Sequence, residues 1–189
     1  LTYTFYLRDD VKFHDGHPFT AKDVEFTYTL LGNKKAVSLY FAKVEPIKGT
    51  KEYYDGKAKK ISGIQIVDDY TIKFTLNQRN VAFLSNLKFP ILPEHIFNKI
   101  PSIEQLSVCS ESQKLIGTGP FILVRYLADQ YYEFKRFDDY WQGRPHIEKI
   151  YVKLAKDDAA IAMLEKGDID YIQEFPASEL DYVKLLPDI

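Results

Sequence analysis

The segment His14-Asp15-Gly16-His17 places two imidazoles and a carboxylate within four residues. Imidazole and carboxylate groups together can bind zinc or nickel. The spacing, however, is neither the i, i+4 pair that puts two ligands on one helix face nor a known ligand motif. An Asp-Gly pair followed by Pro18 is typical of a turn that precedes a helix. We therefore interpret this segment as an exposed turn, and we expect neither a metal site nor a cofactor.

Adjacent carboxylates recur along the chain and could suggest a glycosidase, which needs two opposed carboxylic acids. The four pairs are Asp9-Asp10, Asp68-Asp69, Asp138-Asp139 and Asp157-Asp158. Each pair lies at a predicted turn or helix start, where aspartate is favoured because it hydrogen-bonds the backbone. Neighbouring side chains in a sequence also do not face each other across a substrate. These pairs therefore do not indicate an enzyme.

Two further motifs lack the partners that catalysis would require. Cys109 is the only cysteine, which excludes an internal disulfide, and its sequence neighbours supply no activating histidine. Gly117-Thr118-Gly119-Pro120 resembles part of a phosphate-binding loop. It lacks the Gly-Lys-Ser or Gly-Lys-Thr of such loops, and Pro120 removes one amide donor. We expect a structural turn there and no catalytic residue in the chain.

Composition and charge exclude other classes. The 189 residues are 46% hydrophobic and 28% charged, as in ordinary globular proteins. The net charge is −2, with acids and bases interleaved, whereas a nucleic-acid-binding protein needs a basic surface. No segment approaches the roughly 20 apolar residues that cross a bilayer. Because the chain starts at Leu1 without a signal peptide and ends at Ile189 without a charged tail, we interpret it as an excised segment of a longer protein.

Residue patterns predict the elements that hold these motifs. Alternation predicts strands over residues 1–7, 61–67, 70–76, 121–126, 131–136, 147–154 and 169–173. Helical spacing predicts helices over 21–31, 81–87, from Pro93 at the first helical position, from Asp157 as the N-cap to Gly167, and after Ser178 as the N-cap. The first helix has Thr20 as its N-cap and Gly32 as its stop. Residues 33–60 are rich in lysine and predict a long surface excursion. Strands and helices mix without a regular βαβ rhythm, which predicts an α/β (mixed α+β) protein.

Four stretches together resemble one family. They are Tyr3 to Arg8 with Val11 to Gly16 and Pro18 to Val24, then Gly117 to Phe121, then Asp139-Tyr140-Trp141 with Gly143-Arg144-Pro145, and finally Leu164 to Asp170. Their order and spacing are similar to the family 5 extracellular solute-binding proteins, which are oligopeptide, dipeptide and nickel receptors of ABC importers. The resemblance covers nearly the full chain, whereas each stretch alone is weakly specific.

The resemblance implies a mixed-sheet segment of a bilobed, periplasmic-binding-protein-like class II fold. Residues 1–115 would form the satellite α/β domain of the first lobe, and 116–189 part of the first ligand-binding lobe. The second lobe, with the acidic residue that pairs with a peptide's amino terminus, would be missing. Ligands in such lobes sit beyond the carboxyl ends of strands. The ligand-binding candidates after the strand predicted at 169–173 are Ile172, Gln173, Glu174 and Phe175.

The family also implies a function. The protein would be the substrate-binding component of an ABC importer, which binds peptides outside the cell and delivers them to a membrane permease. It would be a monomer, either periplasmic or anchored as a lipoprotein, with no nucleic-acid partner and no enzymatic activity. A nickel-chelate, haem or oligosaccharide receptor of the same family remains open. So does a different class, the ligand-sensing domain of a regulator.

Overall fold

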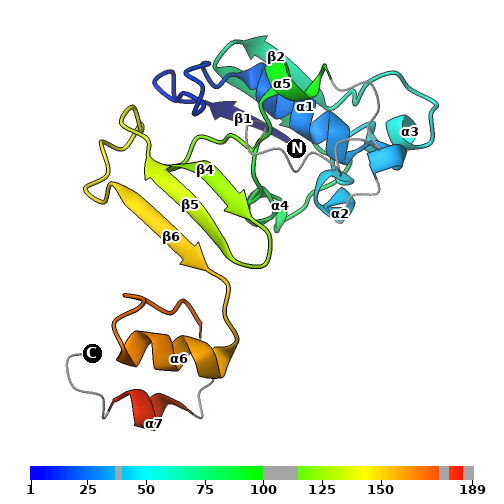
Figure 1. Ribbon diagram of the computed structural model, residues 1–189. Helices are drawn as coiled ribbons and strands as arrows, with labels where there is room; N and C mark the ends of the chain where they lie inside the picture. Colours follow the sequence, from blue (N-terminus) through cyan, green and yellow to red (C-terminus); the bar gives the residue numbers. More distant parts are fainter. Residues whose placement is uncertain (37–39, 100–114, 175–178, 185–189) are drawn as a thin grey trace.

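The computed structural model describes residues 1–36, 40–99, 115–174 and 179–184 and contains two three-stranded antiparallel sheets (Figure 1). The strand orders are β1-β3-β2 and β4-β5-β6. The strands are β1 (Thr2–Tyr6), β2 (Ile64–Asp68), β3 (Thr71–Thr75), β4 (Phe121–Leu127), β5 (Tyr131–Arg136) and β6 (Lys149–Lys153). The helices are α1 (Ala21–Leu31), η1 (Lys34–Ala36), α2 (Phe41–Val44), α3 (Thr50–Tyr54), α4 (Phe83–Asn86), α5 (Glu94–Phe97), α6 (Asp157–Glu165) and α7 (Leu180–Val183). The mixed α/β class is therefore confirmed.

The first sheet forms the core with α1. The predicted hairpin is confirmed, because β2 and β3 pair antiparallel, with Ile66 opposite Ile72 and an irregularity before Asp68. Ile72 and Phe74 point to one face of β3 and are 0% and 2% exposed. Tyr28 of α1 packs on that face with its ring centroid 4.7 Å from that of Phe74. Burial of these apolar groups is the main term that stabilises this half of the chain.

The predicted N-cap at Thr20 is confirmed, and the structure shows that Thr20 and Asp23 together form a capping box at the first turn of α1. The backbone N–H of Thr20 donates to Oδ2 of Asp23 (2.8 Å), and the Thr20 hydroxyl accepts from Lys22 N–H (3.3 Å). The other carboxylate oxygen of the buried Asp23 accepts from the N–H of Glu94 (2.9 Å), the first residue of α5. One carboxylate therefore caps two helices and fixes α5 against α1.

Gly32 follows the last residue of α1, as expected. Its φ is −79°, so the left-handed conformation of a typical glycine stop is absent. A Cβ at Gly32 would lie 2.9 Å from Cδ1 of Ile61. Gly32 thus packs closely against the Ile61 side chain in the segment before β2.

The lysine-rich segment 33–60 is more ordered than the predicted surface excursion. It contains η1, α2 and α3, and it buries Val44, Ile47 and Thr50. The Thr50 hydroxyl donates to the carbonyl of Val44 (3.1 Å), and Lys48 N–H donates to the carbonyl of Thr75 at the end of β3 (2.8 Å). The segment is therefore a folded platform attached to the first sheet, with its lysines on the outside.

The strands predicted in the second half of the chain are confirmed as β4, β5 and β6.

The predictions for the end of the chain need corrections. The helix from residue 157 ends in a Schellman motif, in which the N–H of Gly167 (φ +74°) donates to the carbonyl of Leu164 and the N–H of Asp168 donates to that of Met163. Lys156, and not Asp157, occupies the N-cap position of α6. The strand predicted over 169–173 is wrong, because these residues follow the Schellman turn as irregular backbone.

The remaining predictions concern the helices. The helices predicted over 81–87 and from Pro93 are confirmed as the short α4 and α5, with Pro93 at the N-cap position. Ser178, the predicted cap of the last helix, and Cys109 lie outside the described residues. Within the described part of the chain, every helix is too short or too polar to cross a membrane.

Candidate functional site

His14 lies at a junction between the two sheets, where its backbone N–H and both ring nitrogens have hydrogen-bond partners. Its backbone N–H donates to the carbonyl of Gly117 (2.9 Å), and its Nδ1 accepts from Gly117 N–H (3.2 Å). Its Nε2 lies 3.0 Å from the carbonyl oxygen of Gly119. The ring also packs edge-on against Phe137, with centroids 5.2 Å apart. The Gly-Thr-Gly stretch is therefore docked on the His14 turn.

These contacts determine the protonation state of His14. Because Nδ1 accepts a hydrogen bond, the ring proton is on Nε2, which donates to Gly119, and the imidazole is neutral. Partial burial lowers the pKa of His14, although the Gly119 carbonyl and the charge of Asp15 act in the opposite direction. Protonation would place a donor on Nδ1 opposite the Gly117 N–H and break one of the three bonds.

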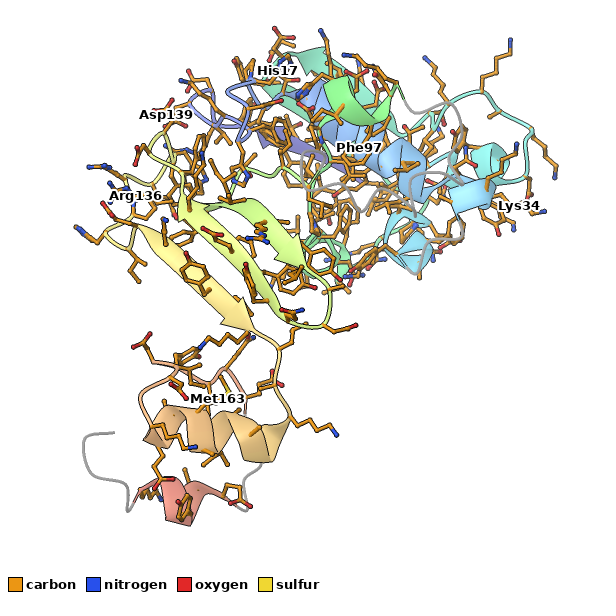
Figure 2. All side chains as sticks on the ribbon, viewed as in Figure 1. His17, Lys34, Phe97, Arg136, Asp139 and Met163 are labelled. Atoms are coloured by element: carbon orange, nitrogen blue, oxygen red, sulfur yellow. The ribbon has the colours of Figure 1, made fainter. Side chains whose placement is uncertain are left out.

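Two further contacts cross the same junction from residues near the first turn. Lys12 Nζ forms an ion pair with Asp139 (3.4 Å), and the guanidinium of Arg8 lies 4.8 Å above the ring of Trp141. Figure 2 shows His17 and Asp139 on the loops at this end of the two sheets. Three stretches of the family resemblance, far apart in sequence, thus meet at one place.

The side chains of the histidine segment contact His95 at the start of α5. Asp15 forms an ion pair with His95 (2.7 Å), whose ring stacks on His17 with centroids 3.9 Å apart. Burial raises the pKa of Asp15, but hydrogen bonds from His95 and His17 outweigh this and the net pKa is lowered. In the described part of the chain, no group of three or more His, Cys, Asp or Glu side chains could hold a metal ion. The segment is a turn, as predicted, but His14 within it is half-buried.

We expect the His14→Phe substitution to lower the free energy of unfolding by about 1–2 kcal/mol, because two side-chain hydrogen bonds are lost and Gly117 N–H loses its partner. The lowered pKa adds a pH dependence. The contribution of His14 is fully present above the ordinary value of 6.5 and is lost as pH falls through the lower folded value. Urea unfolding at pH 7.5 and pH 5 measures both effects.

The diagnostic quantity is the difference in unfolding free energy between the wild type and His14→Phe, because pH effects that arise elsewhere in the chain act on both proteins alike. This difference shrinks at pH 5 if the neutral imidazole is the stabilising form. A difference that is the same at both pH values would contradict the assigned protonation state.

A hollow of about 380 Å³ lies where the second sheet meets α6. Its lining residues are Gln130, Tyr131, Tyr151, Lys153, Leu154 and Met163. Tyr131 and Tyr151 come from β5 and β6, and their ring centroids are 6.3 Å apart. The strands bring the two rings to one face because Tyr131 is opposite Lys153 and Glu133 is opposite Tyr151. This volume lies in the range of small-molecule pockets, about 300–1,000 Å³.

The candidates from the sequence lie on the segment that follows α6. Lys153 Nζ donates to the carbonyl of Asp168 (2.8 Å), which ties the start of this segment to the end of β6. Figure 1 shows the segment passing between α6 and β6. Ile172 is half-buried, and Gln173 and Glu174 are exposed; none of these three is among the residues that line the hollow. Phe175 lies outside the described residues.

Sequence reasoning missed the residues of the hollow. Tyr131 and Tyr151 alternate as ordinary strand residues, and only the strand register brings them together with Met163. The described side chains that line the hollow include no carboxylate, imidazole or thiol. They offer apolar and aromatic walls with one amide, one ammonium group and the hydroxyls of two tyrosines, a composition typical of small-molecule binding pockets.

Comparisons with known proteins agree on one family. The family described as "Bacterial extracellular solute-binding proteins, family 5 Middle" matches residues 1–189. A putative ABC transporter peptide-binding protein of Brucella ovis is 36% identical over 173 residues, which cover 90% of this chain and 30% of that protein.

Two solved structures have the same fold. Lactococcal OppA with an endogenous peptide in the closed conformation matches with a TM-score of 0.89 and 26% identity, over 98% of this chain and 36% of that one. NikZ from Campylobacter jejuni with Ni(L-His) matches with a TM-score of 0.80 and 27% identity, over 100% and 34%. The chain thus spans about a third of the length of these proteins.

Proposed function

Because this chain belongs to family 5 of the bacterial extracellular solute-binding proteins, we propose that it is part of the peptide-binding component of an ABC importer. In this role the protein binds a peptide outside the cytoplasm and delivers it to a membrane permease. The observation that carries the proposal is the family match over residues 1–189, together with relatives named as peptide-binding proteins. Proteins of this family are extracellular or periplasmic, and they bind solutes.

The proposal assigns parts of the chain to parts of the receptor. Residues 1–115 correspond to the satellite domain of the first lobe, and residues 116–189 to part of the first ligand-binding lobe. This division is supported by the two separate sheets, of which β3 ends at Thr75 and β4 begins at Phe121. Contacts of His14, Lys12 and Arg8 join the two sheets.

We place the ligand-facing residues at Ile172, Gln173, Glu174 and Phe175. The bond from Lys153 to Asp168 supports this placement, because it holds the start of the segment at the end of β6, beside the hollow. Exposed Gln173 and Glu174 offer an amide and a carboxylate, groups that can hydrogen-bond a peptide backbone or pair with an amino terminus.

The role as a transport receptor also leads to proposals on enzymatic activity, oligomeric state and location. A receptor that hands over an unaltered solute needs no catalytic residue, so we propose that the protein is not an enzyme. We also propose that it acts as a monomer and that it is either held at the membrane as a lipoprotein or located in the periplasm. Closure of two lobes over the peptide would create the form that docks on the permease.

Native mass spectrometry of the full-length protein, gently purified from the cells that produce it, tests the ligand class. We expect a heterogeneous set of co-purifying masses that fragment as peptides. A single mass that fragments as a metal chelate, haem or an oligosaccharide would replace the peptide with that solute. The measurement would leave the family assignment intact, because NikZ shares the fold and holds Ni(L-His).

A further inference from the structure

The lysine-rich segment 33–60 has a charge that differs from the rest of the chain. It contains eight lysines and three acids, Glu45, Glu52 and Asp55, which gives a net charge of +5. The whole chain carries −2, so the remaining residues carry −7. The positive charge is thus concentrated in one short segment of an acidic chain.

The fold presents nearly all of these lysines to solvent. The exposed lysines are Lys34, Lys35, Lys48, Lys51, Lys57, Lys59 and Lys60. Val44, Ile47 and Thr50 anchor the inner side of the segment in the core, so the lysines stand on a fixed platform. Figure 2 shows side chains with nitrogen tips around Lys34 and the neighbouring α3, and Figure 1 places α3 at the end of the molecule away from β6 and α6. We call these seven residues the lysine patch.

Tyrosines accompany the lysine patch. Lys34 Nζ lies 6.0 Å from the centre of the Tyr54 ring, and Nζ of the half-buried Lys43, which is next to the patch but not part of it, lies 4.9 Å from that of Tyr40. Tyrosine is favoured at the interface between membrane and water because its ring is apolar and its hydroxyl is polar. Lysines near an anionic lipid surface are attracted by its negative potential. Both residue types of this surface are therefore those that contact phospholipid headgroups.

We propose that the lysine patch docks the protein on a bilayer surface that carries anionic phospholipid headgroups. The family is extracellular or periplasmic, where a membrane surface is near and nucleic acid is not the expected polyanion. Docking through α3 leaves the hollow beside α6 uncovered, since the two lie at opposite ends of the molecule. The inference rests on the location of the family and not on the solute, so its test can fail while the proposed function stands.

Co-sedimentation of the purified chain with vesicles tests the proposal. The two vesicle types are pure phosphatidylcholine and a mixture with about 30% phosphatidylglycerol, whose negative charge attracts lysine. We expect binding to the mixed vesicles only, with a loss of about tenfold or more between about 0.05 M and 0.5 M salt, because the Debye length shortens. Equal binding to both vesicle types, or binding that ignores salt, would overturn the proposal.

A pair of variants separates the lysine patch from total charge. Substituting Lys51, Lys57, Lys59 and Lys60 by Gln is expected to weaken vesicle binding at least tenfold. A single lysine at the membrane surface contributes up to roughly fivefold, so partial contributions from four lysines already exceed tenfold. The matched control removes four exposed lysines elsewhere, namely Lys22, Lys88, Lys135 and Lys166. It is expected to change binding about twofold or less. Equal losses in both variants would show a general charge effect and overturn the proposal.

Two additional measurements test whether charge is the determinant of binding and whether an acidic polypeptide is the partner. Substitution of the same four patch lysines by Arg keeps the charge and is expected to keep vesicle binding; a loss would show that the charge is not the determinant. Soluble polyglutamate tests an acidic polypeptide as the partner. If the chain ignores both vesicle types and binds polyglutamate through the lysine patch, the bilayer proposal is wrong. Circular dichroism checks the folding of each variant. We expect every variant to be folded, because all substituted side chains are exposed.

Discussion

The substitution Gly63→Ala is expected to lower the free energy of unfolding by about 3 kcal/mol, near the upper end for overpacking. A Cβ at Gly63 would lie 2.5 Å from the carbonyl oxygen of Thr75 and 2.7 and 2.8 Å from the carbonyl oxygen and nitrogen of Lys48. All three atoms belong to the backbone, so no side chain can rotate away. In thermal unfolding the loss corresponds to a midpoint lower by roughly 6–12 °C.

The reason for this sensitivity is the crossing of three backbone segments. Gly63 N–H donates to the carbonyl of Lys48 (2.7 Å), Thr75 N–H donates to the carbonyl of Gly63 (2.8 Å), and Lys48 N–H donates to the carbonyl of Thr75 (2.8 Å). Adding a methyl group forces these segments apart and weakens several of the bonds together. The platform that carries the lysine patch is attached to the first sheet at this crossing.

Gly119→Ala is the matched control for Gly63→Ala. It adds the same methyl group, but a Cβ there would meet no atom within 4 Å, and the φ of Gly119 is not positive. Its unfolding midpoint is expected to stay close to that of the wild type. If both substitutions destabilise the chain equally, the close approach at Gly63 is not the cause.

Local patterns in the sequence predicted local structure well. The capping box at Thr20 and Asp23 and the hairpin around Asp68-Asp69 are formed by residues within a few positions of one another. Their hydrogen bonds can be read from residue spacing. The second role of Asp23, as the acceptor for Glu94 N–H, could not be predicted, because it depends on a contact between residues 71 positions apart.

The irregular regions were harder to predict for the same physical reason. Residues 33–60 lack a strong period, and their order comes from bonds to β3 that are distant in sequence. The strand predicted over 169–173 has the right alternation, but the backbone there lacks strand hydrogen bonds in the described structure. A strand exists only where a partner strand supplies those bonds. Alternation alone therefore could not decide the outcome.

The stretches that resemble the family contact one another at the His14 junction. The His14 turn, the Gly117-Thr118-Gly119 stretch and the loop that contains Asp139 and Trp141 are separate stretches of the sequence that each resemble the family. In the structure they contact one another through hydrogen bonds, an ion pair and a cation–π contact. These signatures describe how two sheets are joined, which is why they identify the fold and leave the solute undetermined.

The candidate site could be predicted only as a region. The rule that ligands lie beyond the ends of strands led to Ile172, Gln173, Glu174 and Phe175. The hollow instead depends on Tyr131, Tyr151 and Met163, which come from two strands and a helix. The hollow is open on one side in the described part of the chain, and the chain spans only about a third of the length of its relatives. We therefore expect peptide affinity to depend strongly on the rest of the protein.

Residues 1–189 alone are expected to bind a co-purified peptide at least about 1,000-fold more weakly than the full-length protein, a difference of roughly 4 kcal/mol. Tight binding needs both lobes to close and to exclude water from most of the ligand surface, whereas a hollow of about 380 Å³ contacts only part of a peptide. Titration calorimetry with the same peptide on both proteins measures the ratio, after a cooperative unfolding transition has shown that the shorter chain is folded. Nanomolar binding by residues 1–189 would mean that one lobe contains the complete peptide site.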